Sequence, residues 1–516
     1  MLYELPSRHA MTVSFCTALS ALTLSGCGAG GDAVDASTGT ATAAMTVASS
    51  PDASGRSSTV AAYRQSVRTK TRTPATVSPT TSTAPTATAP TGNTQAQPTL
   101  LATSTVSAAT PDRLMVGSSV HFYEGKTDAA RFGTLSKQAG MNTFRTDVQW
   151  WDIEISPGEL SVPAYLANLE NAVNDALARG DRPLLVLDYG NDFYENRGFP
   201  ISDAAQAGFV RFAEFVARHF KGRVSQYEVW NEWNIGTGTP SGNPGSAADY
   251  ARLLKKVYTA VKNVDPSIQV IAGATSQIPS DWITTMIGQA EGKYDAISVH
   301  PYNYSNGPVG RTPEAAMASL NALNQLVTKA AGKSVPLYLT EMGWPTHNGW
   351  NGADKDTAAN FTARMNLLLN QMPFVKGIWW YDFQDDGTDL AEPEQNFGLM
   401  TTTYAPKPAY FSMRDTARLV TTATSVSRVA SCASLYAFKY ALPDGRSTLA
   451  IWSAKGDVLN LKFAGTATLE TLDVGSNVAA KQVSVAANLP YSVTAAERPK
   501  LITGDLSAAS ISAECK

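Results

Sequence analysis

Short apolar runs alternate with longer amphipathic stretches through the middle of the chain. Two of the longer stretches, 204–220 and 247–264, have helical spacing, and the second ends at Asp265-Pro266, as a helix should. Strands that alternate with helices form parallel sheets, and eight such units in roughly 300 residues are typical of a (β/α)8 TIM barrel. We therefore predict an α/β barrel domain at 113–418. The eight apolar runs are 114–122, 141–145, 183–188, 224–231, 268–273, 294–300, 335–341 and 375–383.

A doubly wound parallel sheet is the competing α/β architecture. Such sheets carry a Gly-rich phosphate loop after the first strand, and no such loop follows 114–122. The barrel is therefore the preferred interpretation.

The pattern changes again over residues 419–516. Alternating runs at 435–440 and 447–452 flank the turn Pro443-Asp444-Gly445, which predicts a hairpin, and further runs follow at 459–463 and 467–472. We expect a small C-terminal all-β domain, sandwich-like in form. Few aromatic residues cluster there, which favours a structural cap on the barrel over a carbohydrate-binding module.

The N-terminus has the features of an export signal. Arg8 and His9 precede a mildly apolar stretch, 11–24, which closes with Leu24-Ser25-Gly26-Cys27. This ending resembles the lipobox of bacterial lipoproteins, and it predicts a signal peptide at 1–26 and lipidation of Cys27. The alternative is plain secretion with an incidental cysteine. We expect a cell-envelope lipoprotein, periplasm-facing or on the outer membrane, or a secreted protein.

Residues 27–112 consist mainly of Ala, Thr, Ser and Pro, with few large apolar side chains. A segment of this composition cannot bury enough surface to offset the entropy lost on ordering. It is predicted to be a disordered linker. No stretch of the chain approaches the roughly 18 to 20 uninterrupted apolar residues of a membrane helix, so the lipid is the only membrane contact expected.

Two of the four cysteines fall in the predicted signal and lipobox, which leaves Cys432 and Cys515 in the folded region. An exported chain is in an oxidising compartment, so these two are predicted to form a disulfide. The alternative is a pair of independent buried thiols.

Charge and histidine content limit the partners. A net charge of -3 creates no general attraction for polyanions, so nucleic acid is not an expected partner. None of the five histidines has the i, i+4 spacing of a zinc motif, and no Gly-x-Ser-x-Gly elbow is present. We expect a monomer without a cofactor.

Two glutamates carry the strongest chemical signal. Glu232 lies in Tyr-Glu-Val-Trp-Asn-Glu-Trp-Asn and Glu341 in Leu-Tyr-Leu-Thr-Glu-Met-Gly-Trp, and each ends an apolar run. By strand count these are the ends of strands four and seven, and barrel enzymes carry their reacting groups at strand ends. Hydrolysis of a glycoside needs one carboxyl group to donate a proton and a second to attack or stabilise the anomeric carbon, while indole rings hold the sugar.

These motifs resemble clan A of the glycoside hydrolases, in which an Asn-Glu pair ends strand four and a Glu ends strand seven. The matching residues are Asn231-Glu232 and Glu341. The resemblance implies that Glu232 is the general acid/base and Glu341 the nucleophile. It also implies retention of configuration through a covalent glycosyl-enzyme, with Asn231 bound to the sugar 2-hydroxyl.

Other positions agree with the clan. Arg145, in Phe-Arg-Thr-Asp at the predicted end of strand two, matches the arginine that keeps the nucleophile ionised, although a salt bridge at the barrel bottom is an alternative. His300 and Tyr302, in Val-His-Pro-Tyr, resemble the clan's His-x-Tyr element, in which Tyr hydrogen-bonds the nucleophile and His orients the site. A satisfied core histidine is the alternative for His300.

Trp379 and Trp380 lie where the clan has the aromatic floor beneath the sugar. Adjacent strand residues point to opposite sides, so one of them packs elsewhere, and the clan pattern favours Trp380 as the platform.

The run 151–154, with Pro157-Gly158 after it, is similar to the loop after strand two in family 39. Asp147, Glu154 and Glu228 lie off the catalytic positions and are interpreted as structural.

The sequence therefore predicts a retaining β-glycosidase that cuts a polysaccharide internally. A bacterial exopolysaccharide or biofilm polymer is the expected substrate, because a lipid tether on a long linker holds the enzyme near envelope polymers, and the chain is similar to family 39-like proteins encoded with exopolysaccharide systems. The alternatives are a plant-polymer endoglucanase, mannanase or xylosidase, and a lipoprotein that binds polysaccharide without cleaving it.

Overall fold

The structure is a computed structural model that describes residues 114–122, 125–430 and 432–516. The predicted signal peptide, the lipobox Cys27 and the linker at 27–112 lie outside the described residues and stay predictions. In the part of the chain that is described, no helix combines the length and apolar character needed to cross a bilayer.

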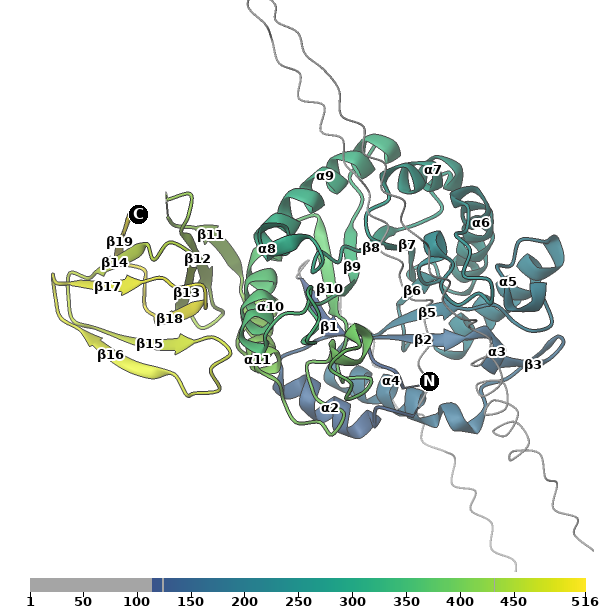
Figure 1. Ribbon diagram of the computed structural model, residues 1–516, viewed down its shortest axis with the longest axis horizontal. Helices are drawn as coiled ribbons and strands as arrows, with labels where there is room; N and C mark the ends of the chain where they lie inside the picture. Colours follow the sequence, from purple (N-terminus) through teal and green to yellow (C-terminus); the bar gives the residue numbers. More distant parts are fainter. Residues whose placement is uncertain (1–113, 123–124, 431) are drawn as a thin grey trace, which may run out of the picture. The chain divides into compact units, whose positions relative to one another are not determined.

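Eight parallel strands form a barrel inside a ring of helices (Figure 1). The sheet has the order β1-β10-β9-β8-β7-β6-β5-β2, and a parallel bridge between Ser119 and Arg145 joins its two edges. The strands are β1 Met115–Ser118, β2 Arg145–Gln149, β5 Leu184–Asp188, β6 Gln226–Val229, β7 Gln269–Ser276, β8 Ala296–His300, β9 Leu337–Met342 and β10 Val375–Trp380. The predicted fold class is confirmed.

One strand differs from its predicted position. The run 141–145 was expected to be the second strand, but β2 begins at Arg145, where that run ends. Arg145 is therefore the first residue of its strand and not the last.

The helices cover the outer face of the barrel. Three of them begin at a capping residue: the side chains of Ser202, Ser246 and Thr312 each accept a hydrogen bond from a backbone N–H in the first turn. Helix α6 has the predicted bounds, and α5 differs by one residue at each end. The helices are α2 Ala129–Gln138, α3 Trp150–Ile153, α4 Ala167–Arg179, α5 Asp203–His219, α6 Ala247–Val264, α7 Ser280–Ala290, α8 Gly307–Gly310, α9 Pro313–Ala331, α10 Lys355–Leu369 and α11 Pro408–Thr422.

Burial in the barrel separates apolar from polar positions along the strands. One inner cluster takes a single residue from each of six strands: Met115, Leu184, Ile271, Ala296, Tyr338 and Trp379. All except Trp379 lie within the first three residues of their strands. Apolar side chains thus fill the interior near the strand starts, which leaves the strand ends for polar groups.

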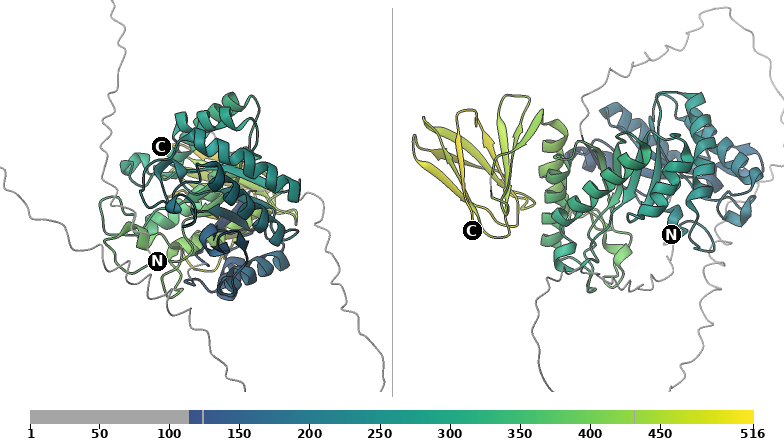
Figure 2. Two further views of the ribbon diagram at one scale, coloured as in Figure 1. Left: turned by 90° about the vertical axis from the view of Figure 1, so that its right-hand side faces the viewer. Right: turned by 90° about the horizontal axis from the view of Figure 1, so that it is seen from above.

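The C-terminal strands form two antiparallel sheets, drawn in yellow and yellow-green in Figure 2. One has the order β11-β12-β13-β18-β15-β16 and the other β17-β14-β19, and side chains from both share a core. The predicted hairpin is β12 paired with β13. The strands are β11 Ser425–Arg428, β12 Tyr436–Ala441, β13 Ser447–Trp452, β14 Val458–Lys462, β15 Ala467–Asp473, β16 Lys481–Val485, β17 Pro490–Thr494, β18 Lys500–Gly504 and β19 Ser510–Glu514.

The predicted disulfide between Cys432 and Cys515 is confirmed, with Cα atoms 5.6 Å apart. It joins the segment before β12 to the residue after β19 and so ties the C-terminal end to the start of the all-β region. The proposed boundary at residue 418 falls inside α11, which continues to Thr422.

Candidate active site

Glu232 and Glu341 lie together at the carboxyl ends of the barrel strands. Glu232 follows β6, Glu341 is the penultimate residue of β9, and their exposed fractions are 5% and 7%. His300, the last residue of β8, lies between them, with Nδ1 3.1 Å from Glu232 Oε1 and 3.5 Å from Glu341 Oε2. One oxygen of each carboxylate and this imidazole all lie within 4.8 Å of one another. The fold thus brings the predicted pair into one buried site.

The backbone turns sharply where it presents Glu232. Trp230 and Glu232 have φ angles of 64° and 50°, in the left-handed region that non-glycine residues seldom adopt. Such a conformation costs roughly 1 to 3 kcal/mol and persists only where surrounding contacts hold it. Here the N–H of Glu232 donates to the carbonyl of Ala274, which follows from the packing of β6 beside β7.

The guanidinium of Arg145 holds three acceptors together in the barrel. Nε donates to Glu228 Oε2 at 2.8 Å, Nη1 to Glu341 Oε1 at 2.8 Å, and Nη2 to Asn231 Oδ1 at 2.9 Å. Arg145 is 4% exposed and Glu228 is fully buried. Arg145 therefore contacts the predicted nucleophile Glu341 directly. This contact is not the alternative considered from the sequence, a salt bridge at the bottom of the barrel.

Electrostatics keep both donors to Glu341 protonated. Burial alone would lower the pKa of Arg145. The negative charges of Glu228 and then Glu341 raise it by more than burial lowers it, so the net shift of the pKa is upward. Burial, followed by the charge of Glu341, also raises the pKa of Tyr302, whose hydroxyl donates to Glu341 Oε2 at 2.9 Å. Each oxygen of Glu341 thus receives one hydrogen bond, which fixes the orientation of the carboxylate.

Asn231 and Glu232 are held by neighbours that the sequence did not identify. The amide of Asn231 accepts from Arg145 and donates to Tyr189 at 2.9 Å, and Thr237 donates to Glu232 Oε2 at 3.2 Å. An amide group has two N–H bonds and two lone pairs, so one of each in Asn231 is used in these contacts. Tyr189 follows β5, and nothing local in its sequence marks it as a partner of Asn231.

Trp380 does not lie at this site, contrary to the expectation. Its indole is 2% exposed, donates to Asn366 of α10 and packs against Trp344, so it fills the layer between the barrel and the helices. Trp379 faces the barrel interior, where its indole donates to Thr143. The two adjacent indoles do point to opposite sides of β10, but this alternation alone does not tell which of the two faces the barrel interior.

Further acids surround Arg145 inside the barrel. Glu228, which was interpreted as structural because it lies four residues before Glu232, contacts the guanidinium directly. Asp188 ends β5 with no exposed surface, and neither of its side-chain oxygens has a hydrogen-bond partner among the described residues. Burial, and then the charge of Asp147, raises the pKa of Asp188 well above its ordinary value, which favours the neutral form of this carboxyl group.

Two groups of side chains in the described residues have a spacing that would admit a metal ion. One is Glu232, His300 and Glu341, and the other is His121, Asp382 and Asp386. In the first group both carboxylates already accept hydrogen bonds from Arg145, Tyr302 or Thr237, an arrangement suited to acid/base chemistry.

Known proteins resemble this chain in sequence and in fold. The model of the cellulase family, glycosyl hydrolase family 5, matches residues 106–381. A β-xylosidase of Geobacillus stearothermophilus is 25% identical over 207 residues, which are 36% of this chain and 40% of the length of that relative.

Solved structures share the fold. A family 39 glycoside hydrolase of Bacteroides cellulosilyticus has a TM-score of 0.61 at 23% identity and covers 76% of this chain and 81% of its own. A monomeric β-xylosidase of Caulobacter crescentus has a TM-score of 0.55 at 14% identity over 76% and 96%. Identities this low show similarity of fold alone.

The barrel, with two buried carboxylates at its strand ends, has the architecture expected of a clan A glycoside hydrolase. The family match covers more than half of the chain. The chain belongs to the cellulase family, glycosyl hydrolase family 5.

Replacing Arg145 by Met is expected to lower the free energy of unfolding by about 3 to 5 kcal/mol, because two buried carboxylates lose their common counter-ion. Arg252→Met is the matched control: Arg252 is 48% exposed and pairs with Asp249 on the surface of α6, so its loss should cost under about 1 kcal/mol. Urea denaturation followed by tryptophan fluorescence measures both. Equal losses in the two variants would contradict the role of the Arg145 network.

Proposed function

We propose that this protein hydrolyses a β-linked polysaccharide by double displacement, with Glu232 as general acid/base and Glu341 as nucleophile. The buried carboxylate pair carries this assignment. Retaining glycosidases hold their two carboxyl groups at about 5 to 5.5 Å and inverting ones at roughly 6.5 to 9.5 Å, to leave room for water. Oxygens of Glu232 and Glu341 that lie within 4.8 Å of each other support the shorter spacing.

The contacts of each carboxylate fit its proposed role. Glu341, oriented by Arg145 and Tyr302, attacks the anomeric carbon while Glu232 donates its proton to the leaving oxygen. Glu232 then removes a proton from water, and the resulting hydroxide breaks the glycosyl-enzyme ester and frees Glu341. His300 Nδ1 can accept a hydrogen bond from the protonated form of Glu232 or donate one to the ionised form. The contact between the two side chains can therefore be kept in both protonation states of Glu232.

Exposed aromatic rings on the catalytic side of the barrel favour a long substrate. Phe193, in the loop after β5, is 44% exposed, and Trp350, in the loop after β9, is 80% exposed. Three strands separate β5 from β9 in the sheet order, so a chain bound at both rings would cross the site. Rings of this kind stack on sugars, which supports binding of a polymer and cleavage within it.

A bacterial exopolysaccharide or biofilm polymer is the proposed substrate. The predicted lipid anchor at Cys27 and the linker to residue 112 support this choice, because they would keep the enzyme beside envelope polymers. The name of the Geobacillus relative supports a second candidate, an exo-acting β-xylosidase. The two candidates differ in the products they release.

Variants with small side chains test the two catalytic roles. Glu232→Ala should lower kcat on an aryl β-glycoside by roughly 10²- to 10⁴-fold, and azide should restore turnover by replacing the incoming water, which gives a glycosyl azide of the substrate's own configuration. Glu341→Ala should lose turnover, and azide in the place of the missing carboxylate should give the opposite configuration. NMR of the products distinguishes the two.

Glu170→Ala is the control, because Glu170 lies on α4 and pairs with His219 and Arg223 away from the site. It should retain wild-type activity. Near wild-type hydrolysis by Glu341→Ala, or identical azide products from both variants, would refute the assignment.

Product sizing tests the substrate and the mode of attack. Purified exopolysaccharides, xylan, mannan and β-glucans are incubated with the enzyme and with Glu341→Ala, and the products are separated by size. We expect oligosaccharides from an exopolysaccharide, and Trp350→Ala should raise KM for that polymer more than for a short aryl glycoside. Xylose alone would favour the β-xylosidase, and polymer binding without products would favour a binding protein.

Cys27→Ser tests the anchor. The wild-type chain, expressed in a bacterium with lipoprotein processing, should sediment with membranes, and the variant should move to the soluble fraction. Cys16→Ser should leave sedimentation unchanged, because Cys16 lies within the predicted signal peptide. A wild-type chain that is soluble after export would contradict lipidation.

A further inference from the structure

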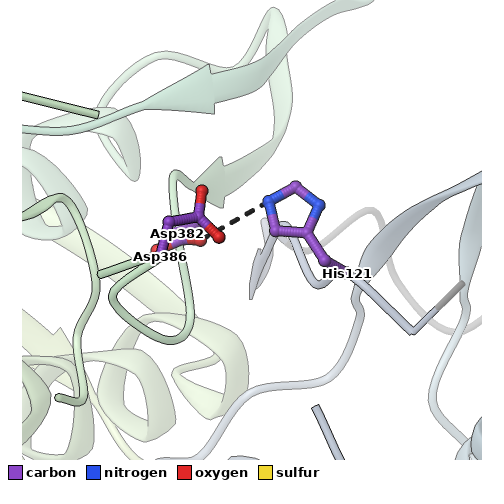
Figure 3. Close-up of side chains that lie close together, drawn as sticks. All are labelled: His121, Asp382 and Asp386. Atoms are coloured by element: carbon purple, nitrogen blue, oxygen red, sulfur yellow. Dashed lines mark ion pairs between the residues drawn. The ribbon is translucent and has the colours of Figure 1, made fainter. Parts of the chain in front are cut away.

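A second cluster of titratable side chains lies at the ends of two neighbouring strands. His121 follows β1, and Asp382 and Asp386 lie in the loop that follows β10, the strand paired with β1. Figure 3 shows the imidazole of His121 facing the two carboxylates. The cluster therefore lies at the same barrel end as Glu232 and Glu341.

The three side chains are close together and largely enclosed. His121 Nε2 is 3.5 Å from Asp382 Oδ2, and one atom from each of the three residues lies within 4.8 Å of the other two. The side chains of His121, Asp382 and Asp386 are 18%, 3% and 9% exposed. Three atoms no more than 4.8 Å apart share a point about 2.8 Å or less from each, so a contraction of under about 1 Å would give zinc-ligand distances of roughly 2.0 to 2.2 Å.

Asp382 supplies an independent sign of a missing partner. Its Oδ1 is buried and has no hydrogen-bond partner among the described residues. The other two acids of this loop each pair with a lysine, Asp386 with Lys126 at 2.8 Å and Asp385 with Lys407 at 2.5 Å. The cation beside Asp382 is an imidazole that is charged only when protonated. A buried carboxylate without a firm counter-ion is costly, and a bound cation would remove that cost.

We propose that His121, Asp382 and Asp386 bind a divalent first-row metal cation. One imidazole nitrogen and two carboxylate oxygens suit Zn²⁺ or Mn²⁺, whereas Ca²⁺ takes six to eight oxygens. Asp386 holds Lys126 through Oδ1, which leaves Oδ2 for the ion. Side chains this enclosed admit a single ion more readily than an ammonium group carried on a sugar ring.

The ion would act as a structural clamp beside the active site. It joins the end of β1 to the loop after β10, across 261 residues of sequence (382 minus 121). Tyr381, next to Asp382, packs edge-on against His121 and against Tyr302, with ring centroids 6.1 Å and 6.4 Å apart. Tyr302 is the donor to Glu341, so the clamp supports the packing around this residue without contacting substrate.

Metal binding by the whole purified chain tests the site. Chelator-treated protein is titrated with Zn²⁺, and in parallel with Mn²⁺, by calorimetry, and bound metal is counted by mass spectrometry after dialysis. We expect one ion per chain and a higher Tm in its presence. His121→Gln and Asp382→Asn should each weaken binding by at least about 10-fold, since even the outer partners of a metal ligand contribute roughly 10- to 100-fold.

Matched variants exclude other sites. Asp389→Asn, an exposed acid of the same loop, and His219→Gln, a histidine on α5, should bind like the wild type. Glu341→Gln should also bind like the wild type, which separates this cluster from the catalytic group of similar spacing. His121→Gln is the more exposed substitution and remains informative if Asp382→Asn does not fold, as circular dichroism would show.

Three results would overturn the proposal: no stoichiometric binding of Zn²⁺ or Mn²⁺ by the wild type, unchanged affinity in His121→Gln, or loss of binding only in Glu341→Gln. The last would put the ion on the catalytic pair. The first two results leave the proposed hydrolysis unaffected, because binding is measured without substrate.

Discussion

The hydrogen bonds of the Arg145 guanidinium hold the centre of this barrel together. A buried cation is costly unless it is paired and its N–H groups are satisfied, and here each of the three nitrogens has an acceptor. The acceptors come from β6, from the turn after it, and from β9. Because Glu228 and Glu341 share one counter-ion, the position of the proposed nucleophile depends on a second carboxylate, Glu228, which has no exposed surface.

Four acids lie near the single guanidinium of Arg145. If Glu228, Glu341, Asp147 and Asp188 were all ionised around one guanidinium, the interior would carry excess negative charge. Burial and then the charge of Asp147 raise the pKa of Asp188, which favours the neutral form of this carboxyl group. The single positive charge of Arg145 pairs with Glu228 and Glu341, its direct partners.

Much of the fold follows from local patterns. The strand runs and the bounds of α6 depend on spacing and capping within a few residues, and Cys432 and Cys515 were the remaining candidates for a disulfide. The site was less predictable where contacts are distant. Glu228 was set aside because it lies off the catalytic position, yet a long arginine side chain that starts β2 contacts it. The left-handed backbone conformations of Trp230 and Glu232 interrupt the alternation of side chains between the two faces of a strand. The directions of the side chains after Val229, where β6 ends, therefore do not follow from the pattern along β6.

Residues of the barrel strands hold the groups proposed for the reaction, whereas residues of the loops are the ones expected to select the substrate. Arg145 and Glu341 lie on strands whose geometry is set by the closed sheet, and Glu232 lies in the turn directly after β6. Their positions therefore depend little on the loops at the rim. Phe193 and Trp350 lie on loops, and the loop of Asp382 and Asp386 is braced by Lys407, which arrives from the start of α11. The family match ends at residue 381, before this last loop. A relative could therefore change its sugar by altering loops alone, whereas a change in reaction would require a new charge balance around Arg145.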